Sequence, residues 1–380
     1  MIRCVPIILA LIGCASAAEP TFLLWDNHES VADYAKKVNL APTMTLDLGN
    51  GIMMELILIP AGKFIMGTPE PTPVDEAGFQ KQIGIGQLGL AASSVTLLIM
   101  LTVVAVRAVR SRRRPQLSLA LLLLITVAAG GCVLGGMSWR QSVQTLEAAK
   151  VNYTAAQARF HDANQDEKPA HLVTLTKPFY MGKFPVTQGQ YKQVMLANPS
   201  QFKDNSANPV DNVSWDDAKN FCKKLSEHSD QAVSLPTEAE WEYGCRAGTT
   251  TAYHSGDTFE DLERVAWYYV NSKNIMHPCG QKAPNAFGLY DMHGNVFQLC
   301  QDYYGDDYYS KSPSKDPEGP NQSAYRVMRG GAWNFAPESC RSSHRGGNPP
   351  DTATYVVGFR VVVSASSPPK SSVSVQPTGQ

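Results

Sequence analysis

The sequence predicts an α+β fold of short helices and strands, interrupted by a two-helix transmembrane hairpin. Amphipathic segments with helix-capping residues lie among strand-like and turn-rich stretches, which is typical of an α+β domain. Two long runs without charged residues flank an arginine cluster, which is the pattern of a membrane-spanning pair of helices. The chain has 380 residues, enough for such a domain beside the hairpin.

The first 18 residues have the layout of a secretory signal. One basic residue precedes a short apolar run and then small residues, and the run is too short to cross a bilayer. Cys14 closes a Leu-Ile-Gly-Cys box that resembles a bacterial lipoprotein cleavage site, whereas Ala15–Ala18 suits ordinary signal cleavage equally well. Either outcome exports the chain.

Residues 19–81 are expected to hold a leader and the first strands of the domain. Ser30 can cap a short helix that ends at Val38. Met54–Met66 alternates weakly between apolar and polar side chains and is broken by Pro60-Ala61-Gly62, which predicts two strands around a tight turn.

Residues 82–139 are predicted to form the transmembrane hairpin. Gln82–Val106 and Gln116–Trp139 contain no charged residue, and each exceeds the ~20 residues that a helix needs to cross a hydrocarbon core. Two buried helices of a soluble protein are the alternative, but charge-free runs of this length are rare outside membranes. Five arginines mark the loop 107–115 as cytoplasmic, which puts both flanks on the extracytoplasmic side, periplasmic or extracellular.

The segments after the hairpin differ in composition. Residues 140–163 lack Gly and Pro and are rich in Ala, Gln and Glu, so they are predicted to continue as a helical stalk. Residues 164–364 are expected to form the remainder of the domain. The Ser/Pro/Gln-rich residues 365–380 are predicted to be a disordered tail.

Two short helices and a strand are predicted in this remainder. Ser214 can cap the first helix, whose apolar face continues towards Ser226. Thr237 and Glu240 have the spacing of a capping box, which predicts the start of the second helix. His171–Leu175 alternates as a strand.

The charge balance argues against nucleic acid as a partner. The formal net charge is −1 at pH 7, and outside the arginine cluster of the hairpin there is no basic stripe with interleaved aromatic residues. Dinucleotide, phosphate-loop and Gly-x-Ser-x-Gly fingerprints are also missing from the sequence.

Six phrases, in this order, resemble the formylglycine-generating enzyme, or sulfatase-modifying factor, family: IPAGKFIMGT, EKPAHLVTLTKPFYMGKFPVTQGQY, PVDNVSWDDAKNFC, SLPTEAEWEYGCRAGT, PNAFGLYDMHGNVF and RVMRGGAW…GFRV. The resemblance implies a C-type lectin-like variant of the α+β class with little regular secondary structure, and the hairpin then falls within a surface loop. It also implies an oxidase that uses copper and oxygen to convert a cysteine of an exported sulfatase to formylglycine.

The copper site of that family requires two cysteines five positions apart after the Gly-Gly motif. Cys340 matches the second of them, but Phe335 stands at the first, and a phenyl ring cannot ligate Cu(I) as a soft thiolate does. The serine that follows Gly-Gly in the family is Ala332 here. The resemblance thus leaves Cys340 as a catalytic candidate without its partner, and copper is not expected.

Five cysteines lie outside the predicted signal and hairpin: Cys222, Cys245, Cys279, Cys300 and Cys340. Export permits disulfides, and there is no CxxC pair or zinc-ligand spacing among them. A disulfide between Cys300 and Cys340, or two separate thiols, is favoured over a copper site rebuilt from that pair. Cys222 and Cys245 lie on neighbouring predicted helices and can pair or stay separate.

The resemblance also implies a calcium site. Its ligands would be the side chain of Asp291, the carbonyls of Gly294 and Val296, and the side chain of Gln298, where the family has a carboxylate. An amide oxygen can ligate Ca²⁺, but the lost negative charge should lower the affinity. Both outcomes, bound and unbound, stay open at this point.

Two functions follow as hypotheses. The first is a membrane-anchored binding or structural subunit of an envelope assembly, with membrane lipid and a protein at the membrane as partners. Tyr303-Tyr304 and Tyr308-Tyr309 are then candidate contacts. The second is an oxidase of the formylglycine-generating type that acts on a cysteine of an exported protein. Glycan binding rests on the lectin-like fold alone.

Overall fold

A computed structural model describes residues 22–69 and 165–365, together with residue 144. Its contacts divide the chain into one unit of residues 1–67 and 165–380 and a second of residues 68–164. The predicted signal and hairpin lie outside the described residues, as does the predicted stalk apart from residue 144. Ala365, assigned to the tail by sequence, is instead buried in the core of the first unit.

The helices predicted from capping residues are present. Ser30 caps α1 (Val31–Lys37), Ser214 caps α5 (Trp215–Ser229) and Thr237 caps α6 (Glu238–Arg246), and in α6 the expected capping box with Glu240 is complete. Two further capped helices were not predicted: α4 (Gln188–Met195) and α7 (Phe259–Glu263). Their N-cap residues, Thr187 and Thr258, are sequence signals of the same local kind as Ser30, Ser214 and Thr237.

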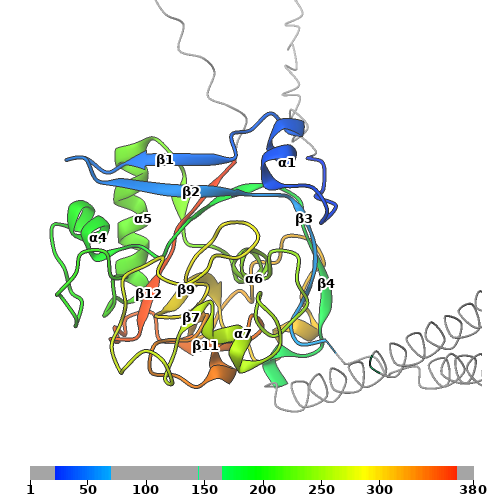
Figure 1. Cartoon of the computed structure of the whole chain (residues 1–380). Helices are drawn as coiled ribbons and strands as arrows, with labels where there is room; N and C mark the ends of the chain where they lie inside the picture. The colour runs from blue at the N-terminus through cyan, green and yellow to red at the C-terminus, as the bar shows by residue number, and fades with distance from the viewer. Residues whose placement is uncertain (1–21, 70–143, 145–164, 366–380) are drawn as a thin grey trace, which may run out of the picture. The chain divides into compact units, whose positions relative to one another are not determined.

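A five-stranded antiparallel sheet forms one side of the first unit (Figure 1). Its strands, in spatial order, are β1 (Thr43–Asp47), β2 (Met53–Ile59), β5 (Phe179–Gly182), β13 (Val362–Ser364) and β6 (Val233–Ser234). The strands β3 (Gly62–Met66) and β4 (His171–Leu175) pair with each other. The two predicted strands around Pro60-Ala61-Gly62 are thus confirmed as β2 and β3, which belong to different sheets.

A second, four-stranded sheet carries the motifs near the C-terminus. Its strands, in spatial order, are β11 (Arg345–Asn348), β10 (Arg326–Arg329), β9 (Phe297–Tyr303) and β12 (Val357–Phe359). The β9–β12 pair is parallel, as is the short pair of β7 (Ala266–Trp267) and β8 (His293–Gly294). Long loops and single-turn helices, namely η1 (Gln165–Glu167), η2 (Tyr308–Ser310) and η3 (Pro337–Cys340), complete the unit.

Two large apolar clusters form the core. One lies around α5, where the rings of Tyr191 and Phe221 stack with centroids 5.6 Å apart and Phe359 of β12 meets Phe221 edge-on. The other surrounds α6 and includes Trp241 and Leu289. Short elements are therefore held mainly by side-chain packing, which burial of aromatic surface makes strongly favourable.

The chain leaves and re-enters this unit at neighbouring points. Gly67, after β3, donates its backbone N–H to Glu242 and accepts a hydrogen bond from Arg246. A Cβ on Gly67 would lie 2.5 Å from the backbone oxygen of Glu167, so the two backbones are in contact. Arg341 binds both carboxylate oxygens of Glu167, at 2.6 and 2.7 Å.

Within the described ranges, no helix combines the length and the apolar character needed to cross a membrane. The predicted hairpin at 82–139 falls outside those ranges and stays a prediction.

Candidate functional site

The loop after β10 places Cys340 in a tightly packed position. Gly330 and Gly331 have φ values of 96° and 76°, in the left-handed region that glycine adopts without strain. A Cβ on Gly331 would lie 2.5 Å from the Cys340 Sγ, so this glycine is required for the close approach of the two segments. The loop then runs through Trp333 and Phe335 to η3, which ends at Cys340.

Phe335 fills its position as a packing residue. Its ring meets that of Phe297 edge-on, with centroids 4.8 Å apart, and packs against the first apolar cluster. Its backbone oxygen accepts a hydrogen bond from the Tyr269 N–H at 3.0 Å. The side chain that replaces the expected thiolate is thus half-buried and packs against the core.

Cys340 itself is fully buried beside Tyr253, Leu262 and Tyr268. Burial raises the pKa of its thiol to about 12, so the sulfur stays protonated at neutral pH. A buried, protonated thiol is neither a good nucleophile nor a good metal ligand.

The remaining cysteines do not rebuild a copper site. All five described cysteines are free thiols, so neither the pair Cys300–Cys340 nor the pair Cys222–Cys245 is formed. The reason is packing: the members of each pair belong to different apolar clusters. Across the described part of the chain, no three His, Cys, Asp or Glu side chains are grouped so that they could hold a metal ion. The residues present do not fit copper.

A buried histidine pair, which the sequence did not reveal, lies next to this loop. The Nδ1 of His293 lies 2.7 Å from the Cys340 carbonyl oxygen, and its Nε2 lies 3.1 Å from the backbone N of His254. The two imidazole rings stack with centroids 4.8 Å apart. Burial lowers the pKa of His254 to about 4 and that of His293 well below its usual range, so both are neutral at pH 7.

A buried ionic network supports the same loop from the side of α6. Arg345 donates to both carboxylate oxygens of Glu238 at 2.6 and 2.8 Å, and Arg329 pairs with Glu242. All four side chains are at most 2% exposed. Charges this deeply buried are tolerated only when paired, so the network fixes α6 against β10 and β11.

Two of the four proposed calcium ligands, Asp291 and Gln298, hydrogen-bond to other partners. Asp291 Oδ2 accepts the Gly280 N–H at 2.8 Å. Gln298 Oε1 accepts hydrogen bonds from Trp241 and Arg360, and its Nε2 donates to the Asp291 carbonyl oxygen at 2.7 Å. With both lone pairs of Gln298 Oε1 engaged and an N–H turned towards Asp291, the residues do not fit a calcium site.

The exposed aromatic residues are not those expected from the sequence. Tyr309 is only 2% exposed, and Tyr304 and Tyr308 pack against the second apolar cluster. Tyr269 and Tyr355 are instead 62% and 47% exposed. Both lie next to the Phe335 loop. The Tyr269 backbone N–H donates to the Phe335 backbone oxygen, and the Tyr355 ring lies beside that of Trp333, with centroids 6.2 Å apart. We call the exposed residues Tyr269, Val270 and Tyr355 the aromatic surface, and the buried Trp333 lies beside Tyr355.

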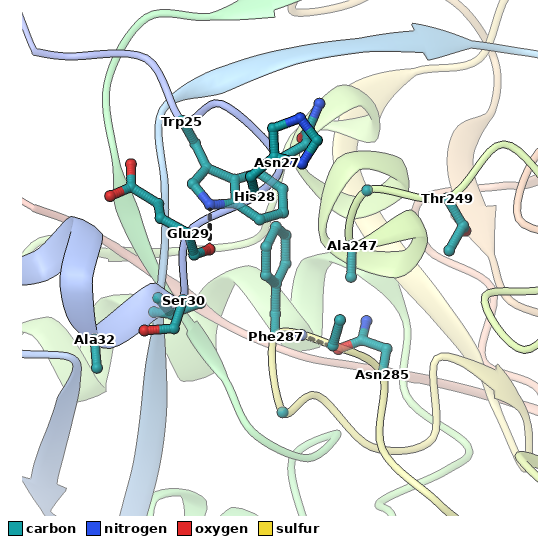
Figure 2. Close-up of a pocket in the computed structure, with 14 residues that line it drawn as sticks. Trp25, Asn27, His28, Glu29, Ser30, Ala32, Ala247, Thr249, Asn285 and Phe287 are labelled. Carbon is teal, nitrogen blue, oxygen red and sulfur yellow. Dashed lines mark hydrogen bonds between the residues drawn. The ribbon is translucent and has the colours of Figure 1, made fainter.

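A separate open pocket of about 740 Å³ lies between the segment before α1 and the loop at residues 285–288 (Figure 2). Trp25 stands over Phe287, with ring centroids 5.0 Å apart, and its Nε1 donates to the Glu29 carbonyl oxygen. Asn285 uses its side chain to hold Gly244 and Phe287. The Asn285 side chain thus stabilises the turn at residues 285–288, and His28, Glu29 and Ser30 also line the pocket.

Comparisons with known proteins agree with this architecture. A profile described as "Sulfatase-modifying factor enzyme 1-like domain" matches residues 138–365. The "Formylglycine-generating enzyme" of Streptomyces coelicolor is 34% identical over 167 residues, which cover 40% of this chain and 51% of that protein. The "Serine/threonine-protein kinase pkn1" of Chlamydia pneumoniae is 31% identical over 227 residues, covering 52% of this chain and only 35% of the kinase.

Two solved structures share the fold. "Treponema denticola variable protein 1" has a TM-score of 0.50 and 29% sequence identity, and the match covers 51% of this chain and 87% of that one. The structure of PvdO from Pseudomonas aeruginosa has a TM-score of 0.54 and 23% identity, with coverage of 85% and 99%. The second likeness supports the mixed α and β architecture alone.

Proposed function

The chain belongs to the sulfatase-modifying factor enzyme 1-like family, and from this premise we propose that it is a binding or structural subunit of an envelope assembly without copper oxidase activity. Family membership supplies the scaffold, while the site residues decide the chemistry. In this proposal the domain is extracytoplasmic and is anchored by the hairpin predicted at residues 82–139.

The observation that carries the proposal is the packing of Phe335. Its ring occupies the position where the family motif requires a thiolate, and Cys340 is left alone and fully buried. Cu(I) in proteins is held by soft sulfur ligands, and a single protonated thiol offers no stable site for it. Loss of the metal site removes the oxidation step.

The aromatic surface supports a binding role at the same loop. Exposed Tyr residues supply large contact areas with a polar tip, and such residues are enriched at protein interfaces. Tyr269 and Tyr355 both border the Phe335 loop. A protein at the membrane, together with membrane lipid around the predicted hairpin, is the proposed set of partners.

An oxidase of the formylglycine-generating type is the second candidate. The 34% identity with the Streptomyces coelicolor enzyme favours it. It requires a second sulfur ligand beside Cys340, and the motif position for that ligand holds Phe335.

A Cu(I) competition titration separates the two functions. The full-length protein, purified in detergent under reducing conditions, is titrated with Cu(I) against a chromogenic chelator, with Cys340→Ser as the matched control. We expect both proteins to leave the copper on the chelator. Stoichiometric binding by the native chain that disappears in Cys340→Ser would instead support the oxidase.

A further inference from the structure

Gln298 lies at the centre of a buried cross-link between three segments. It is fully buried on β9. Its Oε1 accepts the Trp241 Nε1–H of α6 at 2.9 Å and the Arg360 Nε–H at 2.6 Å. Its Nε2 donates to the Asp291 carbonyl oxygen at 2.7 Å. The amide therefore connects α6, the segment after β12 and the turn that begins at Asp291.

This arrangement excludes a cation by geometry. Ca²⁺ takes six to eight oxygen ligands, and each must have a free lone pair. Both lone pairs of the Gln298 oxygen hold N–H groups, and its NH₂ group faces the Asp291 backbone. Asp291 Oδ2 accepts the Gly280 N–H, which occupies one of its lone pairs.

The local charge is also balanced without a metal. Asp291 contributes one negative charge and Arg360 one positive charge, so the cluster is formally neutral. Arg360 is fully buried and donates further hydrogen bonds to the Gly182 and Tyr290 carbonyl oxygens. Burial raises the pKa of Asp291, and the nearby Arg360 offsets part of this rise.

We propose that the Gln298 amide makes this turn metal-independent, and that the identity of residue 298 determines whether the domain responds to calcium. The hydrogen bonds of the amide connect α6, the segment after β12 and the turn at Asp291, so no bound cation is needed to connect them. Replacing Gln298 by Glu removes the N–H that faces Asp291, frees its carbonyl oxygen and changes the formal charge of the cluster from 0 to −1. Each change favours Ca²⁺.

The test compares the thermal unfolding of the native full-length chain and of Gln298→Glu, followed by tryptophan fluorescence. Each protein is measured with a calcium chelator, with excess Ca²⁺ and with excess Mg²⁺. We expect the native Tm to be the same in all three. The Tm of Gln298→Glu should rise in Ca²⁺ alone, by about 5 °C at a concentration one hundred times the Kd.

A native Tm that rises with Ca²⁺ would overturn the proposal. A Gln298→Glu protein with the same Tm in chelator and in Ca²⁺ would also overturn it. So would a variant that is unfolded under both conditions. A variant that folds only in Ca²⁺ would support it. The double variant Gln298→Glu with Asp291→Asn is the matched control, because it restores the formal charge of the wild-type cluster and should lose the response.

Discussion

At the scale of single residues, Arg329 is the buried cation that faces two buried carboxylates, those of Glu238 and Glu242. Its guanidinium is fully buried, pairs with Glu242 and lies 3.6 Å from Glu238. Removing one partner from a buried pair leaves the other charge without compensation.

We predict that Arg329→Met lowers the free energy of unfolding by about 3–5 kcal/mol. Urea denaturation followed by tryptophan fluorescence measures this loss. Lys36→Ala is the matched control, because Lys36 forms an exposed pair with Asp33 and its removal should leave the midpoint unchanged. Equal, small effects of both variants would show that the network contributes nothing.

The buried histidine pair predicts a specific loss of stability in acid. The pKa of a histidine is about 6.5 in the unfolded chain, whereas burial lowers the pKa of His254 to about 4 in the folded chain. Between pH 6.5 and 4, His254 therefore binds a proton in the unfolded state but not in the folded state. Stability is fully present above pH 6.5 and falls as the pH drops towards 4.

His254→Phe should reduce the loss of stability between pH 6.5 and 4 by about 2.5 kcal/mol. The ring nitrogens of His254 are buried and have no hydrogen-bond partner among the described residues, so Phe removes the titration at little cost in contacts. Asp211, whose pKa is raised to about 6, acts in the opposite direction in both proteins and cancels in the difference. Parallel stability curves for the two proteins would contradict the assignment.

The sequence predicted the role of a single site residue only where that residue occupies a defined position in a motif. Phe335 was identified because its position relative to Gly-Gly is fixed by the family motif. The Glu238–Arg345 pair joins residues 107 positions apart, and nothing in the local sequence of either residue indicates the other. Gln298 was identified as a departure from the motif, but its three hydrogen-bond partners required the fold.

At the scale of elements, local signals predicted helices far better than sheets. The starts of α1, α5 and α6 follow from the capping residues Ser30, Ser214 and Thr237, the last of which has its capping-box partner Glu240. The parallel pairing of β9 with β12 joins segments about 60 residues apart and leaves no local signature. Tyr309 was expected at the surface but is buried. The reason is the same, because burial depends on which segments pack together.

The contact between Gly67 and Glu167 predicts that residues 68–164 can be removed. Their flanking backbones already touch, so a linker of about six Gly and Ser residues closes the gap at little entropic cost. We expect the shortened protein to unfold cooperatively, with a Tm within about 3 °C of the full chain. Circular dichroism and thermal melting test this.

The outcome against this prediction is a shortened protein that fails to fold or melts without a cooperative transition. Gly67→Leu in the shortened protein is a useful comparison. Its side chain would collide with the Glu167 carbonyl oxygen and Tyr309, so it should destabilise the junction.

At the scale of the whole molecule, the predicted hairpin decides where the domain works. The full chain should sediment with membranes and resist extraction by alkaline carbonate, because about 20 apolar residues per helix insert stably into a bilayer. The shortened protein without residues 68–164, expressed without residues 1–18, should stay in the supernatant. A full chain that carbonate releases would remove the membrane anchor from the proposed function.

We propose that one missing sulfur ligand, at Phe335, separates this protein from the copper oxidases that its family motifs resemble. Cu(I) titration of Phe335→Cys tests it most directly, with the native chain and Phe335→Cys combined with Cys340→Ser as controls. We expect one tightly bound Cu(I) in the single variant and none in either control. Tight binding by the native chain, or a folded Phe335→Cys that binds no copper, would contradict it.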